Sequence, residues 1–288
     1  MTKNHNDLPK LREIWAAHSW KRDYEKYLLL SRFIFRPIGF LLTWIAIRAG
    51  LTSEAVSWFS GFVGIAACVC LVSGNANLLP FGLALLIFFN LLDCVDGSIA
   101  RTMKTENPYG RFLDSICGGI VDMAFWAVVG IMAYHHPHYL LRPDPFEYGP
   151  IFWLVLGGLT CFLFILLGYL EQTFDRLLRS GWERLNADIV NTEELTMKKR
   201  SFQHLRSSQK DKSVNILRKI NTNLRVRETH YFFLIITFWL GIIDFLLEFY
   251  FLYYTVHTII LMIIYCSRGT KIRDNIQEHN DYHSKVVR

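Results

Sequence analysis

Long runs of uncharged hydrophobic residues alternate with short charged segments along this chain. Six runs approach the roughly 20 residues that a helix needs to cross a bilayer, and they lie near residues 55–73, 78–92, 116–134, 150–170, 231–243 and 249–266. The second, third and fifth runs continue into charged ends. The pattern therefore predicts an all-α, multi-pass membrane protein with six transmembrane helices.

A further apolar stretch, "YLLLSRFIFRPIGFLLTWIAIRAG", precedes the first run and is interrupted by Arg32, Arg36 and Arg48. It predicts an amphipathic helix within residues 26–50 that lies in the membrane interface, with a seventh span as the alternative. The N-terminal "MTKNHNDLPKLREIW" lacks the apolar core of a signal peptide, so the first membrane element is expected to stay in the mature chain.

These patterns divide the chain into six segments. We expect a cytoplasmic segment at 1–25, the interfacial helix at 26–50, four spans within 51–171, a basic cytoplasmic insertion at 172–229, two spans within 230–267 and a cytoplasmic tail at 268–288. With the N-terminus in the cytoplasm, Arg142 is the one residue of 31 Lys and Arg that falls in a translocated loop, as the positive-inside rule requires. A composition with 52% hydrophobic residues agrees with a membrane protein.

The net charge of +6 is concentrated in the insertion, where 13 Lys and Arg face 7 Asp and Glu. Its basic residues alternate with apolar ones, as in "VNILRKINTNLRVR". This pattern is typical of an amphipathic helix on anionic lipid, with a solvated helical hairpin as the alternative. We therefore expect the lipid bilayer as a partner, and no nucleic acid.

The most polar part of the hydrophobic region is "DCVDGSIARTMKTENPYGRFLDSICGGIVD", residues 93–122. Residues three, four and seven apart share a helix face, and one such stripe holds Asp93, Asp96, Gly97, Ala100 and Arg101. The next helix carries Asp114, Gly118 and Asp122 at intervals of four. If the two helices pack antiparallel, Asp114 approaches the carboxylates of the first stripe.

Three carboxylates in this place suit magnesium or manganese, which take oxygen ligands and bridge them to substrate phosphates. Carboxylates at the end of a membrane helix are costly unless they are paired, bound to metal or open to water, which favours a functional site. Interfacial carboxylates paired with Arg101 and Lys104 are the alternative, but that reading leaves the small residues Gly97 and Ala100 unexplained.

Seven of these residues, in their order and spacing, closely resemble the signature of the CDP-alcohol phosphotransferase (CDP-alcohol phosphatidyltransferase) family; they are Asp93, Asp96, Gly97, Ala100, Arg101, Gly110 and Asp114. The predicted architecture is similar to that family over about residues 26–267. The resemblance implies transfer of a phosphoalcohol group from a CDP-alcohol to an acceptor hydroxyl, with release of CMP.

The resemblance also implies roles for single residues. Asp93, Asp96 and Asp114 would hold two magnesium or manganese ions, which can clamp the attacking and leaving oxygens of an in-line displacement. Arg101 would contact the diphosphate, and Gly97 would lie beneath the nucleotide. Two further residues, Gly110 and Ser57, would also adjoin the CDP part of the donor.

Two departures from the family pattern affect this reading. The family has a fourth aspartate, usually assigned as a ligand and general base, where this chain has Gly118. Asp122 and His230 are the candidate bases, and a metal ion that lowers a hydroxyl pKa would make a side-chain base unnecessary. The second departure is "LTSEAVS" at 51–57, where similar proteins commonly read Leu-Thr-Pro-Asn.

We therefore expect a metal-dependent transferase of phospholipid or lipid-linked glycan biosynthesis, with its active site facing the cytoplasm. Its acceptor would be a membrane lipid or a polyol. Intramembrane prenyltransferases usually carry two Asp-rich motifs, whereas this chain has a single cluster. The alternative is a non-catalytic membrane protein that retains a metal-nucleotide site. Similar proteins are often homodimers, which is the ground for expecting a homodimer here.

Overall fold

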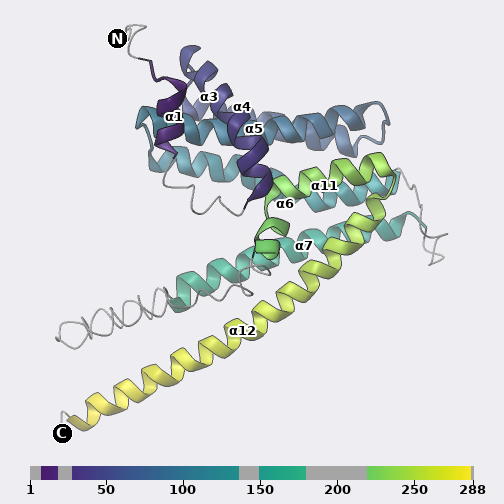
Figure 1. Ribbon diagram of the computed structural model, residues 1–288. Coiled ribbons are helices and arrows are strands. Elements are labelled where there is room, and N and C mark those ends of the chain that lie inside the picture. The colour runs from purple at the N-terminus through teal and green to yellow at the C-terminus, as the bar shows by residue number, and fades with distance from the viewer. Residues whose placement is uncertain (1–7, 19–27, 136–148, 180–218, 287–288) are drawn as a thin grey trace. The chain divides into compact units, whose positions relative to one another are not determined.

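All the regular secondary structure in the described part of the chain is helical, which confirms the all-α prediction. This computed structural model describes residues 8–18, 28–135, 149–179 and 219–286. Its elements are α1 (Leu11–Ala17), the π-helical η3 (Ser31–Phe35), α3 (Arg36–Arg48), α4 (Ser53–Val72), α5 (Leu78–Met103), α6 (Pro108–His135), α7 (Ile151–Thr173), the π-helical η4 (Phe174–Arg179), α11 (Arg227–Leu240) and α12 (Ile243–Val286) (Figure 1).

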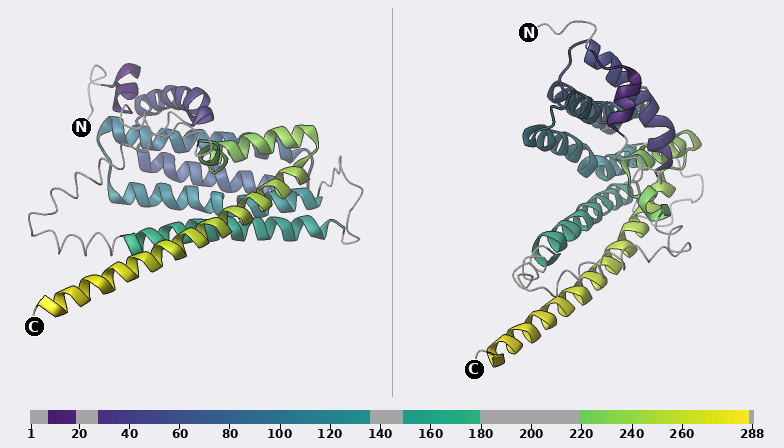
Figure 2. Two further views of the ribbon diagram at one scale, coloured as in Figure 1. Left: turned by 60° about the horizontal axis from the view of Figure 1, so that its bottom comes forward. Right: turned by 60° about the vertical axis from the view of Figure 1, so that its left-hand side comes forward.

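The helices belong to two compact units. The first unit comprises the described parts of Met1–Cys161 and Asn215–Glu248, and the second those of Phe162–Val214 and Phe249–Arg288. In the first unit, α4 packs against α5 and α6, while α1, α3 and α11 all contact α5 (Figures 1 and 2). In the second unit, the ring of Phe174 stacks on that of Tyr265, with centroids 4.2 Å apart.

Glycines allow the helices of the first unit to approach closely. A Cβ added to Gly64 of α4 would lie 2.5 Å from Val121 Cγ2 in α6 and 3.0 Å from Phe89 Cδ2 in α5. A Cβ on Gly157 of α7 would lie 2.6 Å from the Cα of Gly130 in α6. Small residues at helix crossings are common in membrane proteins, where close packing replaces the hydrophobic effect between helices.

Within the described part of the chain, five helices are long and apolar enough to cross a membrane; they are Ser53–Val72, Leu78–Met103, Pro108–His135, Ile151–Leu178 and Ile243–Asp274. The predicted fifth run corresponds to α11, which has 14 residues and is therefore about 21 Å long at 1.5 Å per residue. That length is less than the roughly 30 Å of a hydrocarbon core. The predicted count of six spans is not confirmed.

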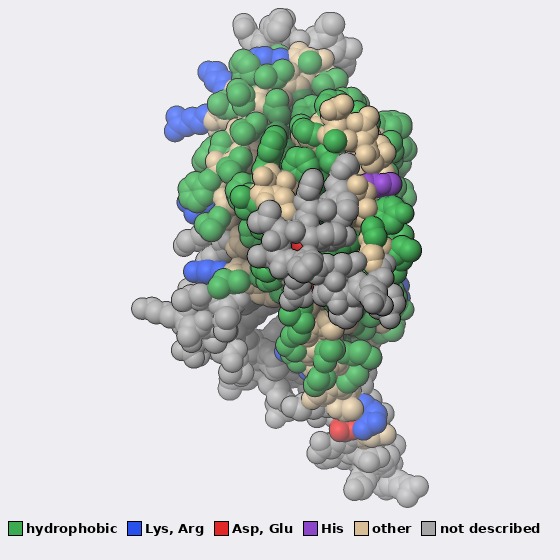
Figure 3. Space-filling model, turned by 90° about the vertical axis from the view of Figure 1, so that its right-hand side faces the viewer, with side chains coloured by type: hydrophobic (Ala, Val, Ile, Leu, Met, Phe, Trp, Pro, Cys, Tyr) green, Lys and Arg blue, Asp and Glu red, His purple; other side chains and the backbone are tan. Residues whose placement is uncertain are grey.

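Large hydrophobic side chains remain exposed on the membrane helices, among them Trp58, Phe59 and Phe62 of α4. Hydrophobic side chains also make up most of the described surface on the face in Figure 3. Exposed apolar area of this extent is typical of protein that contacts lipid. The helices and this surface support an integral membrane protein.

The stretch before the first span is helical, with η3 leading directly into α3. It exposes Phe33, Ile38, Leu41 and Ile45, and the Arg48 guanidinium lies 3.8 Å from the ring centroid of Trp44. Its predicted place in the membrane interface stays a prediction, as do the segment boundaries. Most of the predicted insertion, residues 180–218, lies outside the described residues.

Candidate functional site

The turn between α5 and α6 is held by specific caps. α5 ends at Met103, and its C-cap residue Lys104 has a left-handed φ of 56°. The Thr105 N–H donates to the carbonyl of Ala100 at 2.9 Å, which is the usual way to satisfy the last carbonyls of a helix. Asn107 Oδ1 accepts from the N–H of Gly110 at 2.7 Å, and its Nδ2 donates to Glu54 Oε1 at 3.2 Å. The start of α6 is therefore tied to α4.

A cavity of about 730 Å³ opens beside this turn. Its lining comes from the end of α3, the start of α4, the end of α5 and the start of α6. Six residues predicted to bind metal or the CDP part of the donor line it; they are Ser57, Asp96, Gly97, Arg101, Gly110 and Asp114. These six residues, which span 57 positions of the sequence from Ser57 to Asp114, thus share one cavity.

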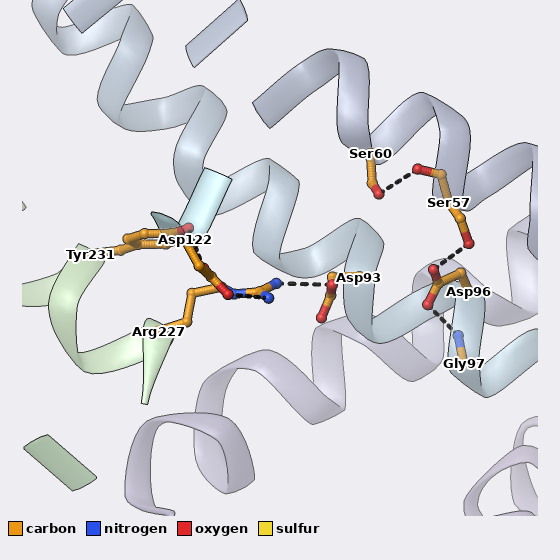
Figure 4. A network of polar contacts seen from close by, with 8 residues as sticks. All are labelled: Ser57, Ser60, Asp93, Asp96, Gly97, Asp122, Arg227 and Tyr231. Atoms are coloured by element: carbon orange, nitrogen blue, oxygen red, sulfur yellow. Dashed lines mark hydrogen bonds and ion pairs between the residues drawn. The ribbon is translucent and has the colours of Figure 1, made fainter. Parts of the chain in front are cut away.

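Asp96 is a buried carboxylate of the cavity, with 2% of its surface exposed. Its Oδ2 accepts a hydrogen bond of 2.6 Å from the Ser57 hydroxyl, and its Oδ1 accepts from the N–H of Gly97 (Figure 4). Ser53 donates to the Asp96 carbonyl at 3.0 Å. These bonds hold the α5 carboxylate against α4 and set its orientation without help from a ligand.

Arg101 supplies a cation within the same cavity. A Cβ added to Gly97 would lie 3.2 Å from both Nη atoms of Arg101. The guanidinium therefore lies over the bare backbone of Gly97, one turn along α5. A planar cation with several donors in this position suits a phosphate or diphosphate group.

Asp93 has a different environment from Asp96, and it is not among the residues that line the cavity. Its Oδ1 lies 2.8 Å from Nη1 of Arg227, which comes from the start of α11. Arg227 Nη2 donates to Asp122 Oδ2 at 2.8 Å (Figure 4). The guanidinium thus bridges two carboxylates, from α5 and α6, and also lies 5.1 Å from the ring centroid of Phe89.

Neither predicted base lines the cavity. Asp122 contacts Arg227, and the Tyr231 hydroxyl lies 3.5 Å from its Oδ1. His230 is 4% exposed, its Nε2 lies 2.8 Å from the Leu224 carbonyl oxygen, and its ring centroid lies 5.2 Å from that of Trp126. In this structure both side chains belong to the packing between α6 and α11.

The fit of the site to a metal ion follows from these positions. Among the residues that the structure describes, no group of three or more His, Cys, Asp and Glu side chains is placed to hold an ion. Asp96 and Asp114 nevertheless share the cavity, and one or two carboxylates plus substrate phosphates are a common ligand set for magnesium. The cavity therefore fits an ion shared with a substrate phosphate, while Asp93 contacts Arg227.

Arg227 and Asn107 are not among the site residues predicted from the sequence. Arg227 belongs to the end of the stretch assigned to a basic insertion, so its charge was attributed to lipid contact. Asn107 lies in the polar stretch 93–122 but was given no role, although Asn before Pro108 is a typical helix start signal. The Pro108 position at the start of α6 agrees with that signal.

Comparison with known proteins relates part of the chain to one family. Residues 51–176 match the family model for CDP-alcohol phosphatidyltransferases. The phosphatidylinositol phosphate synthase of Mycobacteroides abscessus is 30% identical over 108 residues, which cover 35% of this chain and 48% of that protein. The protein of the same name from Mycolicibacterium smegmatis is 29% identical over 114 residues, which cover 36% and 48%.

The chain thus spans about half the length of the curated relatives that it matches. No solved structure matches it significantly. The family model covers α4, α5 and α6, which together carry the signature residues of the cavity. On these grounds residues 51–176 are similar to the CDP-alcohol phosphatidyltransferase family.

Proposed function

We propose that this protein transfers a phosphoalcohol group from a CDP-alcohol to an acceptor hydroxyl and releases CMP. The observation that carries the proposal is the shared cavity of Asp96, Asp114, Gly97 and Arg101, which offers carboxylates, open backbone and a cation in one place. Such a combination suits a diphosphate that is bound together with a divalent ion.

In this reaction the acceptor oxygen forms a bond to the phosphorus that carries the alcohol. The bond from that phosphorus to the oxygen of CMP breaks, and the hydroxyl proton passes to water. Arg101 binds the diphosphate and orients it, because its guanidinium lies at the cavity wall over Gly97. Gly97, Gly110 and Ser57 line the space for the CDP part.

Divalent ions are generally used in this family, and we propose magnesium or manganese here. When bound, such an ion neutralises the charge that develops on the phosphoryl oxygens. Asp96 and Asp114 are the residues that would hold it, since both line the cavity. The sequence predicted Asp93 as a third ligand and two ions in total; the partner of Asp93 in this structure is Arg227.

The substrates we propose follow from the relatives and from the membrane setting. The relatives are named phosphatidylinositol phosphate synthases, so a CDP-linked lipid with a phosphorylated inositol is the first pair to test. Other CDP-alcohols with a lipid or polyol acceptor form the rest of the panel. We place the cavity on the cytoplasmic side, because that orientation leaves Arg142 as the one Lys or Arg in a translocated loop.

The test is CMP release by the purified full chain in lipid nanodiscs, with magnesium or manganese, over this panel. Release that needs the metal and one donor–acceptor pair, and that is lost in Asp96→Asn and Asp114→Asn, supports the proposal. Asp274→Asn is the matched control, because this α12 side chain is 59% exposed and pairs with its neighbour Arg273. Equal release by all four proteins would contradict it.

The second candidate is a non-catalytic protein that binds a CDP-alcohol. The observation that favours it is the place of the two predicted bases, Asp122 and His230, in the packing between α6 and α11. Metal-dependent binding of a CDP-alcohol without CMP release for any acceptor would favour this candidate. Homodimer formation, a prediction from the resemblance, is tested on the same samples by their mass in solution.

A further inference from the structure

We infer that Arg227 is a fixed cation of this site that stands in place of a second divalent ion. The chain would then use one ion, held by Asp96 and Asp114, while the guanidinium pairs with Asp93. This inference rests on the proposed function, since it concerns the charge of the same site. It assigns a part in that site to α11, which lies outside the residues 51–176 that the family model matches.

The space for the guanidinium comes from Gly118. A Cβ added at this position would lie 2.8 Å from Nη2 of Arg227 and 3.5 Å from Oδ1 of Asp93. Any larger side chain, including the aspartate that the resemblance leads us to expect at 118, would have to displace Arg227. The glycine and the arginine are therefore linked: one leaves the volume open and the other fills it.

The charges agree with this arrangement. Asp93 and Asp122 each lie 2.8 Å from the guanidinium, and the Arg227 side chain is 19% exposed. Asp93 Oδ1 is thus already paired with a cation at contact distance. A divalent ion on the same oxygen would lie within a few ångströms of the guanidinium, and like charges at such a distance repel strongly in a partly buried site.

Packing fixes the cation in place. Arg227 begins α11 and lies over Phe89. Tyr231, one turn later, is 1% exposed, and its ring centroid lies 5.2 Å from that of Phe125 and 6.5 Å from that of Phe89. The arginine is therefore part of the folded core and does not exchange with solvent as a metal ion does.

The experiment counts manganese ions bound to the full chain in lipid nanodiscs, with Mn²⁺ in the presence of CDP as the probe, because the cavity fits an ion that is shared with a phosphate. Equilibrium dialysis gives the stoichiometry, and electron paramagnetic resonance distinguishes a single Mn²⁺ from a spin-coupled pair. We expect one Mn²⁺ per chain for the wild type and for Arg227→Lys, which keeps the charge. The double variant Gly118→Asp with Arg227→Gln frees Asp93 and adds a carboxylate, so we expect two ions and a coupled signal.

Arg48→Gln is the matched control, because Arg48 also lies over an aromatic ring but belongs to α3, outside the cavity lining. It should keep one ion. Two ions or a coupled signal in the wild type would overturn the inference and restore the two-ion prediction, even if the double variant does not fold. Absence of Mn²⁺ binding would also overturn it. CMP release by the wild type tests the proposed function separately, so the two failures are distinguishable.

Discussion

Replacing Ser57 with alanine removes one hydrogen bond from the carboxylate that we place at the metal. The Ser57 hydroxyl donates to Asp96 Oδ2 at 2.6 Å, and both residues are almost fully buried, with 1% and 2% exposed. A hydrogen bond to a charged group contributes about 1.5–3 kcal/mol. Since each 1.36 kcal/mol is a factor of about ten, we expect kcat/KM for CMP release to fall by roughly 10- to 100-fold.

The assay is CMP release at low donor concentration, together with Mn²⁺ affinity on the same protein. Ser60→Ala is the matched control: this hydroxyl is on the same helix, is 2% exposed, and donates to the Ser57 carbonyl at 2.8 Å, away from Asp96. We expect its rate to stay near that of the wild type. The reasoning is refuted if Ser57→Ala keeps its rate and Mn²⁺ affinity within twofold, or if both variants lose activity equally.

Three further predictions concern the donor, the metal and the fold. Arg101→Ala should lower kcat/KM by about 10-fold or more, because a charge-assisted contact to phosphate is lost; unchanged kinetics would place the diphosphate elsewhere. EDTA should abolish CMP release and excess magnesium should restore it, whereas release that persists after dialysis would contradict a metal requirement. Gly157→Val should destabilise the protein by about 1–3 kcal/mol or more through overpacking, because a Cβ there meets the Gly130 backbone at 2.6 Å; Gly158→Val, with no atom within 4 Å of its added Cβ, should unfold thermally like the wild type.

The sequence predicted the membrane helices well because a long apolar run has few alternatives to a helix in lipid. The predicted starts at 55 and 78 lie within two residues of the observed starts of α4 and α5. The fifth run was less well predicted. Gly241 takes a left-handed φ of 69° and ends α11, so the apolar residues on its two sides belong to different helices.

The spacing of polar residues predicted which of them share a helix face, but not which neighbour each one meets. Asp93 and Asp96 are three positions apart on α5, so their spacing predicts that both lie on the same helix face. In the structure Asp96 faces Ser57 at the cavity while Asp93 faces Arg227 (Figure 4). The difference depends on which helices pack on either side of α5. The spacing of residues along one helix does not give that packing.

The absence of an aspartate at 118 illustrates why a local motif is an incomplete description of a charged site. On its own, Gly118 reads as the loss of a ligand and of a base, and it favours a protein without activity. The structure sets Arg227, 109 positions later, in the volume that this glycine leaves open, where its guanidinium pairs with Asp93. A glycine in place of a carboxylate and a guanidinium beside Asp93 both make the site more positive, so we expect the site to need fewer metal charges to receive a diphosphate. A departure at a ligand position therefore has to be judged together with the new neighbours of the ligands that remain.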